Sequence, residues 1–171
     1  MSRTGLVLVS ALLPVLVGSC GGAAPDGAER LPGSAGSLEE LATTVLVGLA
    51  AADTVSLETV RLTEDEHNDL VWPELPASAP EVNYPVDLAW KNIRTRNRAA
   101  LSDLFAVYEN RELQFVHAEC RGFTEAFDSF VVHTDCWVTL ERDGERLPPQ
   151  QLFKDVLDRE GGLKIFRYYE P

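Results

Sequence analysis

The sequence predicts an α+β domain, in which N-terminal helices pack on a curved antiparallel sheet, after a cleaved signal peptide. Hydrophobic side chains recur every three or four residues as far as Tyr108, which is typical of amphipathic helices. Beyond Asn110 they alternate instead, which is typical of strands with one buried face. Residues 1–19 have the order of charges, apolar residues and small residues found in signal peptides.

The N-terminal segment predicts export. Arg3 precedes an apolar run, residues 6–17, of about twelve residues, whereas a bilayer-spanning helix needs roughly twenty. The quartet 17–20, Val-Gly-Ser-Cys, resembles the lipobox of bacterial lipoproteins, with Val where Leu is usual. The resemblance implies that Cys20 is lipidated, becomes the mature N-terminus and anchors the chain to the inner or the outer membrane. The alternative is an ordinary secretory signal with a chance cysteine.

Composition divides the rest of the chain into two parts. Residues 20–36 are mostly Gly, Ala, Pro and Ser, which predicts a flexible tether. Residues 37–171 have the usual size of a single domain with one hydrophobic core.

Charge and cysteine content limit the partners. Of 15 Lys and Arg residues, Arg3 is lost with the leader, so 14 basic residues face 27 acidic ones and the mature charge is near −13. Neither nucleic acid nor bare anionic lipid is therefore an expected partner. With Cys20 carrying a lipid, Cys120 and Cys136 remain, and an exported chain meets an oxidising compartment. The sequence therefore predicts a disulfide between them.

Four helices are expected, at about residues 38–52, 54–60, 64–72 and 88–108. Ser37 with Glu40, and Thr63 with Glu66, have the capping-box pattern that begins a helix. The proline-rich segment 73–85 ends the third helix and predicts a loop.

Four strands are expected, at residues 112–121, 130–141, 145–157 and 163–169. Asp143-Gly144 and Gly161-Gly162 predict tight hairpin turns between the last three. The strands then form an antiparallel meander. The Cys120–Cys136 pair and the two turns each fix the register of neighbouring strands, and all three give the same buried face. A bulge at Pro148-Pro149 would shift the third strand by one residue.

This order of elements resembles a known family. The similarity is carried by Ala-Ala-Ala-Asp at 50–53, Leu-Thr-Glu-Asp-Glu-His at 62–67, Trp-Pro at 72–73 and the closing strand 162–168. These segments resemble the nuclear-transport-factor-two-like, cystatin-like α+β cone that SnoaL-like cyclases and ketosteroid isomerases share. The resemblance implies a conical cavity between sheet and helices, and often a homodimer through the outer sheet face. It implies no particular activity, because members differ in function.

The predicted register places Asp155 beside Tyr168 at the mouth of the cone, with Gln151 and Thr134 nearby. A desolvated carboxylate beside a phenol could act as a general base with a hydrogen-bond donor, which is proton-transfer chemistry. The alternative is that Asp155 lies in water or is neutralised by an arginine.

Two further groups of residues are candidates for a site. Glu66 and His67 could line the cavity, although Glu66 has an alternative role as the capping partner of Thr63. The pairs His117 with Glu119 and His133 with Asp135 each share a strand face, but two ligands make a poor metal site. No metal or other cofactor is expected.

The sequence lacks a nucleophile elbow, a glycine-rich phosphate loop and a spare cysteine, which weighs against hydrolase and nucleotide-dependent functions. It favours a membrane-anchored module that binds a small apolar ligand or a protein and is not an enzyme. One alternative is a proton-transfer enzyme with Asp155 as base and Tyr168 as donor. The other is a noncatalytic structural protein of the cell envelope with a filled cone.

Overall fold

The computed structural model describes residues 29–170. The predicted signal peptide, Cys20 and most of the predicted tether lie outside this range, so export and lipidation stay predictions. Among the described residues, no helix is both long and apolar enough to cross a membrane.

The helices begin where the caps predict. The elements are α1 (Leu38–Ala50), α2 (Thr54–Thr59), α3 (Glu64–Glu66), the π-helical turn η1 (His67–Val71), the 3-10 turns η2 (Trp72–Glu74) and η3 (Pro76–Ser78), and α4 (Val86–Tyr108). The Ser37 hydroxyl accepts a hydrogen bond from the Glu40 N–H, and Thr63 and Glu66 form a reciprocal capping box. Both predicted helix starts are confirmed.

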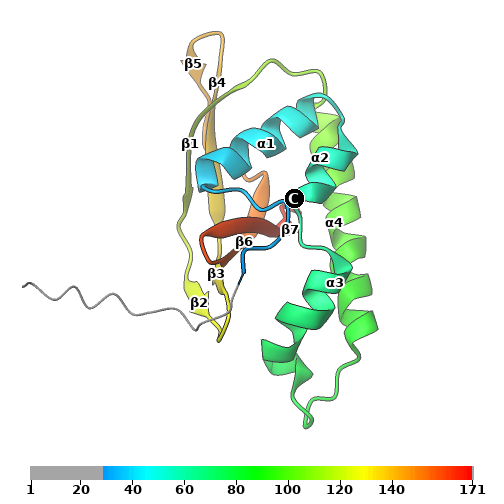
Figure 1. Ribbon diagram of the computed structural model, residues 1–171. Helices are drawn as coiled ribbons and strands as arrows, with labels where there is room; N and C mark the ends of the chain where they lie inside the picture. The colour runs from blue at the N-terminus through cyan, green and yellow to red at the C-terminus, as the bar shows by residue number, and fades with distance from the viewer. Residues whose placement is uncertain (1–28, 171) are drawn as a thin grey trace, which may run out of the picture.

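The strands form two antiparallel sheets. One has the order β1-β4-β5, from β1 (Gln114–Cys120), β4 (Cys136–Arg142) and β5 (Glu145–Arg146). The other has the order β2-β3-β6-β7, from β2 (Thr124–Ala126), β3 (Val131–His133), β6 (Phe153–Arg159) and β7 (Gly162–Tyr168). The predicted α+β class is therefore confirmed at the level of helices and antiparallel sheets (Figure 1).

The single predicted meander is wrong. The expected strand 130–141 is broken at Thr134-Asp135, where Asp135 adopts a positive φ of 56°. This kink places β3 and β4 in different sheets. The Asp143-Gly144 turn does join β4 and β5, with both residues at positive φ, in a hairpin that extends beyond the body of the molecule (Figure 1). Cys120 and Cys136 are disulfide-bonded cross-strand partners, which confirms the predicted pair.

The predicted register between β6 and β7 is also wrong. Glu160 and Gly161 have positive φ and form the turn, which begins one residue earlier than the predicted Gly161-Gly162. Leu157 consequently pairs with Lys164 instead of Phe166. Irregularities on both sides of Asp155 then bring Arg167 opposite Asp155, where Tyr168 was expected.

These changes divide the predicted single buried face into two. Val156 and Ile165 pack with α1 and α4 in the larger hydrophobic cluster. Their neighbours Leu157 and Phe166 belong to a smaller cluster that joins Leu62 and other N-terminal residues to Phe130 and Val132. Because adjacent strand residues point to opposite faces, both faces of β6 and β7 are covered.

Residues 29–36 belong to the folded domain, although the sequence predicted a tether as far as residue 36. Leu31 and Ala35 are buried, and Ala35 exchanges two backbone hydrogen bonds with Leu163 of β7. The Arg159 guanidinium donates to the Glu29 carbonyl. Leu31 joins the smaller hydrophobic cluster, so one large apolar side chain and these hydrogen bonds together dock the segment.

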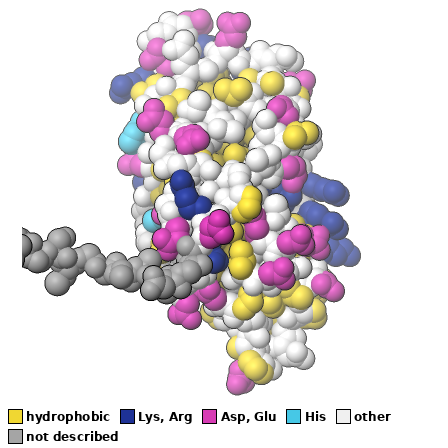
Figure 2. All heavy atoms as spheres, in the orientation of Figure 1, with side chains coloured by type: hydrophobic (Ala, Val, Ile, Leu, Met, Phe, Trp, Pro, Cys, Tyr) yellow, Lys and Arg dark blue, Asp and Glu magenta, His cyan; other side chains and the backbone are white. Residues whose placement is uncertain are grey.

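The surface is predominantly acidic. The complete chain carries a net charge of −12, and acidic side chains are spread over the face shown in Figure 2. Several basic side chains lie together at the right edge of this view, and others are scattered over the rest of the face.

Candidate functional site

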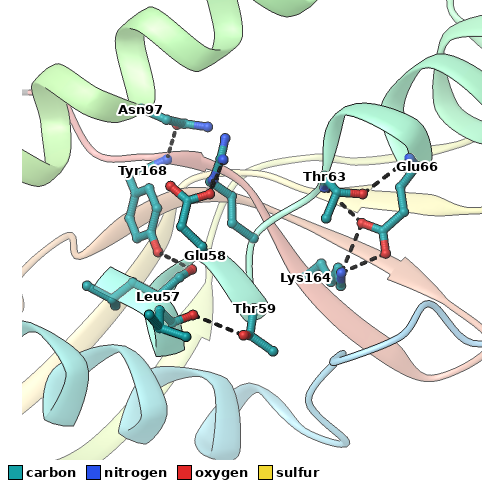
Figure 3. Close-up of polar contacts among 10 residues, drawn as sticks. Leu57, Glu58, Thr59, Thr63, Glu66, Asn97, Lys164 and Tyr168 are labelled. Carbon is teal, nitrogen blue, oxygen red and sulfur yellow. Dashed lines mark hydrogen bonds and ion pairs between the residues drawn. The ribbon is translucent and has the colours of Figure 1, made fainter. Parts of the chain in front are cut away.

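The segment between α2 and α3 pairs with β7 and brings polar residues, among them Arg61 and Glu66, close to that strand. The Leu62 N–H donates to the Ile165 carbonyl, and the Ile165 N–H donates to the Val60 carbonyl, so Arg61 is a parallel bridge partner of Ile165. This pairing brings α3, which ends at Glu66, close to β7 (Figure 3).

Glu66 neutralises a buried lysine. The Lys164 ammonium donates to the two Glu66 carboxylate oxygens at 2.7 and 2.9 Å, and Lys164 is only 1% exposed (Figure 3). The same carboxylate accepts the Thr63 N–H at 2.8 Å. Glu66 therefore has the capping role that the sequence offered as one alternative, and its carboxylate accepts from both Lys164 and Thr63.

His67 is completely buried beside two tryptophans, with its ring centroid 5.8 Å from Trp72 and 5.3 Å from Trp90. Its Nδ1 lies 2.7 Å from Asn68 Oδ1, and its Nε2 has no hydrogen-bond partner within the described protein. Burial lowers the pKa of His67 below its ordinary value, and the Asn68 contact opposes this only in part. The imidazole is consequently neutral at pH 7.

Arg61 and two residues of α4, Trp90 and Asn97, are further buried polar groups with unpaired atoms. The Arg61 guanidinium pairs with Glu58 and lies 5.5 Å from the centre of the Trp90 ring, while Arg61 Nη1 has no partner within the described protein. Trp90 Nε1 and Asn97 Nδ2 are likewise unpaired. Arg61, His67, Trp90 and Asn97 are all buried, so these unpaired atoms are closed to solvent.

Tyr168 has a structural role. Its hydroxyl donates to the Leu57 carbonyl at 3.0 Å, and its N–H donates to Asn97 Oδ1 at 3.0 Å (Figure 3). Burial raises its pKa far above the ordinary value, so the phenol stays protonated. These two bonds hold α2 and α4 against β7.

Asp155 is buried, with 1% of its surface exposed, but it does not lie opposite Tyr168. Its carboxylate forms an ion pair with Arg167, which is the arginine-neutralised alternative of the sequence analysis. The predicted partnership with the Tyr168 phenol is wrong, because the turn begins earlier and bulges flank Asp155.

A pocket of about 240 Å³ lies beside the C-terminal half of α4. Its rings come from three different elements: Tyr108 from α4, Trp137 from β4 and Tyr169 after β7. The remaining lining residues are Asp103, Gln150 and Gln151, which are polar, and Leu104, Val107 and Pro149, which are apolar.

Asp135 positions the polar side of this pocket. Its Oδ1 accepts hydrogen bonds from Trp137 Nε1 at 2.9 Å and from Gln151 Nε2 at 2.8 Å. The backbone of Gln150 exchanges two hydrogen bonds with Val138 of β4. Tyr108 donates to Gln150 Oε1 at 3.4 Å, and burial raises the pKa of its phenol. The walls of the pocket are thus fixed by hydrogen bonds within the protein.

The predicted site residues are therefore separated in space. Gln151 lines the pocket, Glu66 and His67 lie by β7, and the Thr134 hydroxyl donates to the Phe123 carbonyl, away from the pocket. The sequence assigned no binding role to Asp103, Tyr108, Trp137 or Tyr169. The only available signal was the aromatic character of Trp137 and Tyr169, since their spacing does not relate them to α4.

The two histidine pairs considered as metal ligands contribute no clustered site. Between residues 29 and 170, no three His, Cys, Asp or Glu side chains gather closely enough to hold a metal ion. Glu119 pairs with Arg121, which lowers the pKa of its carboxylate, and His133 lies 3.9 Å from Asp158.

Comparison of the chain with protein-family models, with characterised proteins and with solved structures found no match.

Proposed function

We propose that this protein is an exported bacterial lipoprotein, anchored through a lipid on Cys20, whose folded domain is a binding module. The pocket formed by Tyr108, Trp137 and Tyr169 binds its small ligand. The observation that carries this proposal is the pocket itself, because ligand sites are concave, mainly apolar and supplied with a few fixed polar groups.

We also propose that the domain is related to the nuclear-transport-factor-two-like α+β cone. Helices α1 and α4 packed against antiparallel strands support this relationship (Figure 1). The buried side chains between α4 and β7 favour a filled interior, so ligand binding is assigned to the pocket at the α4–β4 side.

The proton-transfer alternative has less support. The Asp155 carboxylate is ion-paired with Arg167, and the Tyr168 hydroxyl is used by the Leu57 carbonyl. Asp155 Oδ1 has no hydrogen-bond partner within the described protein, but a general base must be within reach of a substrate, and Asp155 is buried.

Binding can be tested by screening small molecules against the purified mature chain, with a thermal shift as the first readout. Hits are then titrated against Trp137→Leu and against the control Phe123→Ala, which removes a 68% exposed ring that does not line the pocket. We expect Trp137→Leu to weaken binding and Phe123→Ala to leave it unchanged. Binding that survives Trp137→Leu would assign the ligand to another site.

The anchor is tested separately by Cys20→Ala. The wild-type chain should partition into the detergent phase and carry an acyl mass on its N-terminus, and the variant should do neither. A wild-type mature chain that partitions into the aqueous phase without acylation would overturn the lipoprotein assignment.

A further inference from the structure

The pocket is lined by three aromatic residues, and most of its side-chain donors, apart from the Tyr169 hydroxyl, are used within the protein. Gln151 Nε2 donates to Asp135, and Gln150 Nε2 donates to the Pro148 carbonyl at 2.9 Å. The Tyr108 hydroxyl faces Gln150 Oε1, and Trp137 Nε1 donates to Asp135. An anion entering here would find few free N–H or O–H groups.

The local charge is negative. Asp103 is the one charged side chain among the residues that line the pocket. Asp135 lies behind the lining and accepts only neutral donors, so no cation cancels its charge in these contacts. Arg121 is close to Trp137, but its charge is balanced by Glu119, to which it donates at 2.6 Å.

Aromatic rings attract cations through the negative potential above their faces, and tryptophan does so most strongly. Trp137 already attracts one, since the Arg121 guanidinium carbon lies 5.5 Å from its ring centre. Tyr108 and Tyr169 add two more rings to the same pocket, and Asp103 adds a carboxylate. The combination of several aromatic rings with a carboxylate suits an organic cation.

Resting on the function proposed above, we infer that the ligand carries a cationic amine, preferably a quaternary ammonium group. Such a group is bulky and weakly hydrated, so apolar contacts with Leu104, Val107 and Pro149 favour it along with the rings and Asp103. A volume of about 240 Å³ accommodates a compact headgroup of this kind.

The test compares choline with 3,3-dimethyl-1-butanol, which has the same shape but no charge. Both are titrated into the mature chain in a nonionic detergent, with tryptophan fluorescence and calorimetry as readouts. We expect choline to bind about tenfold more tightly than the neutral alcohol, and the difference to shrink as salt screens Asp103. Equal affinities would overturn the cation assignment while leaving the pocket as a binding site.

Variants locate the effect. Asp103→Asn should weaken choline binding several-fold without changing binding of the alcohol, whereas Asp87→Asn, an exposed acidic residue in the first turn of α4, should change neither. Trp137→Leu should weaken both. If choline and the alcohol both fail to bind but neutral screening hits still depend on Trp137, the cation assignment fails alone. If nothing depends on Trp137, the proposed function fails as well.

A free amine and a lipid headgroup share this chemistry, and glycerophosphocholine distinguishes them. Its phosphodiester is repelled by Asp103, so we expect it to bind more weakly than choline, which assigns a free amine. Binding at least as tight as that of choline would assign a headgroup as the source of the ammonium group.

Discussion

The Asp155 carboxylate is ion-paired with the Arg167 guanidinium across the β6–β7 pair. Asp155 is buried, while the Arg167 side chain is 37% exposed, so the arginine reaches from solvent to a carboxylate in the interior. Arg167 thus supplies a counter-charge at Asp155 Oδ2, while Oδ1 has no hydrogen-bond partner within the described protein. The Tyr168 phenol takes no part, because its hydroxyl donates to the Leu57 carbonyl.

Asp155→Asn should therefore lower the free energy of unfolding by about 1–3 kcal/mol, because a charged hydrogen bond is replaced by a neutral one in a buried position. Choline binding should be unaffected. Urea denaturation of this variant, of Arg167→Gln and of the double variant measures the coupling between the two side chains. Unchanged or higher stability together with loss of an enzymatic turnover would instead favour the proton-transfer alternative.

Lys164→Met should destabilise the domain by about 3–5 kcal/mol, because it leaves the Glu66 carboxylate without its buried counter-charge. Lys154→Met is the matched control, since Lys154 is exposed on the neighbouring strand and should have little effect. Adding Glu66→Gln to Lys164→Met should recover part of the loss. The two lysine variants are compared by urea denaturation. Equal free energies of unfolding would show that the Lys164–Glu66 ion pair does not stabilise the fold.

His67 should make stability depend on pH. Its pKa is lowered in the folded protein by burial, so the unfolded chain binds the proton more tightly. Above the ordinary histidine pKa of about 6.5, the imidazole is neutral in both states and does not oppose folding. As the pH falls below that value, protonation of the unfolded chain lowers the free energy of unfolding. His67→Gln should reduce this fall, measured as the unfolding free energy from pH 7.5 to pH 5. His117→Gln, on a residue in β1, is the control, and identical pH profiles for all three proteins would refute the assignment.

Removing the disulfide should also be costly. Cys120 and Cys136 are 16 residues apart, and the chain-entropy model gives about 3 kcal/mol for a loop of this size. The double variant Cys120→Ala with Cys136→Ala should lose about this much stability. A nonreduced digest of the wild type should contain the two cysteine peptides joined, and two free thiols in the exported protein would contradict the pairing.

Local signals predicted the helices well. Ser37, Asp53 and Thr63 each cap a helix, as side-chain acceptors placed before an amphipathic run should. The same local logic found the Asp143-Gly144 hairpin. These features depend on residues within four or five positions of one another, which the sequence displays directly.

The division of the strands into two sheets and the formation of the pocket depend on contacts between segments that are distant in the sequence. The positive φ of Asp135, which separates β3 from β4, is not encoded by alternation of apolar residues. Glu160-Gly161 and Gly161-Gly162 are both acceptable turn sequences, and the choice between them moves every pair in β6 and β7. Asp103, Trp137 and Tyr169 meet only after both choices are made.

The docking of residues 29–36 against β7 sets how far the domain can stand from a membrane. If Cys20 carries the anchor, the chain from Cys20 to Glu29 can span at most about 30 Å when fully extended. The β6–β7 turn, to which Glu29 is bonded through Arg159, must therefore remain within that radius of the lipid surface. A domain held by so short a tether would stay in a shallow layer above the bilayer. A soluble amine would then have to diffuse into that layer before it could bind.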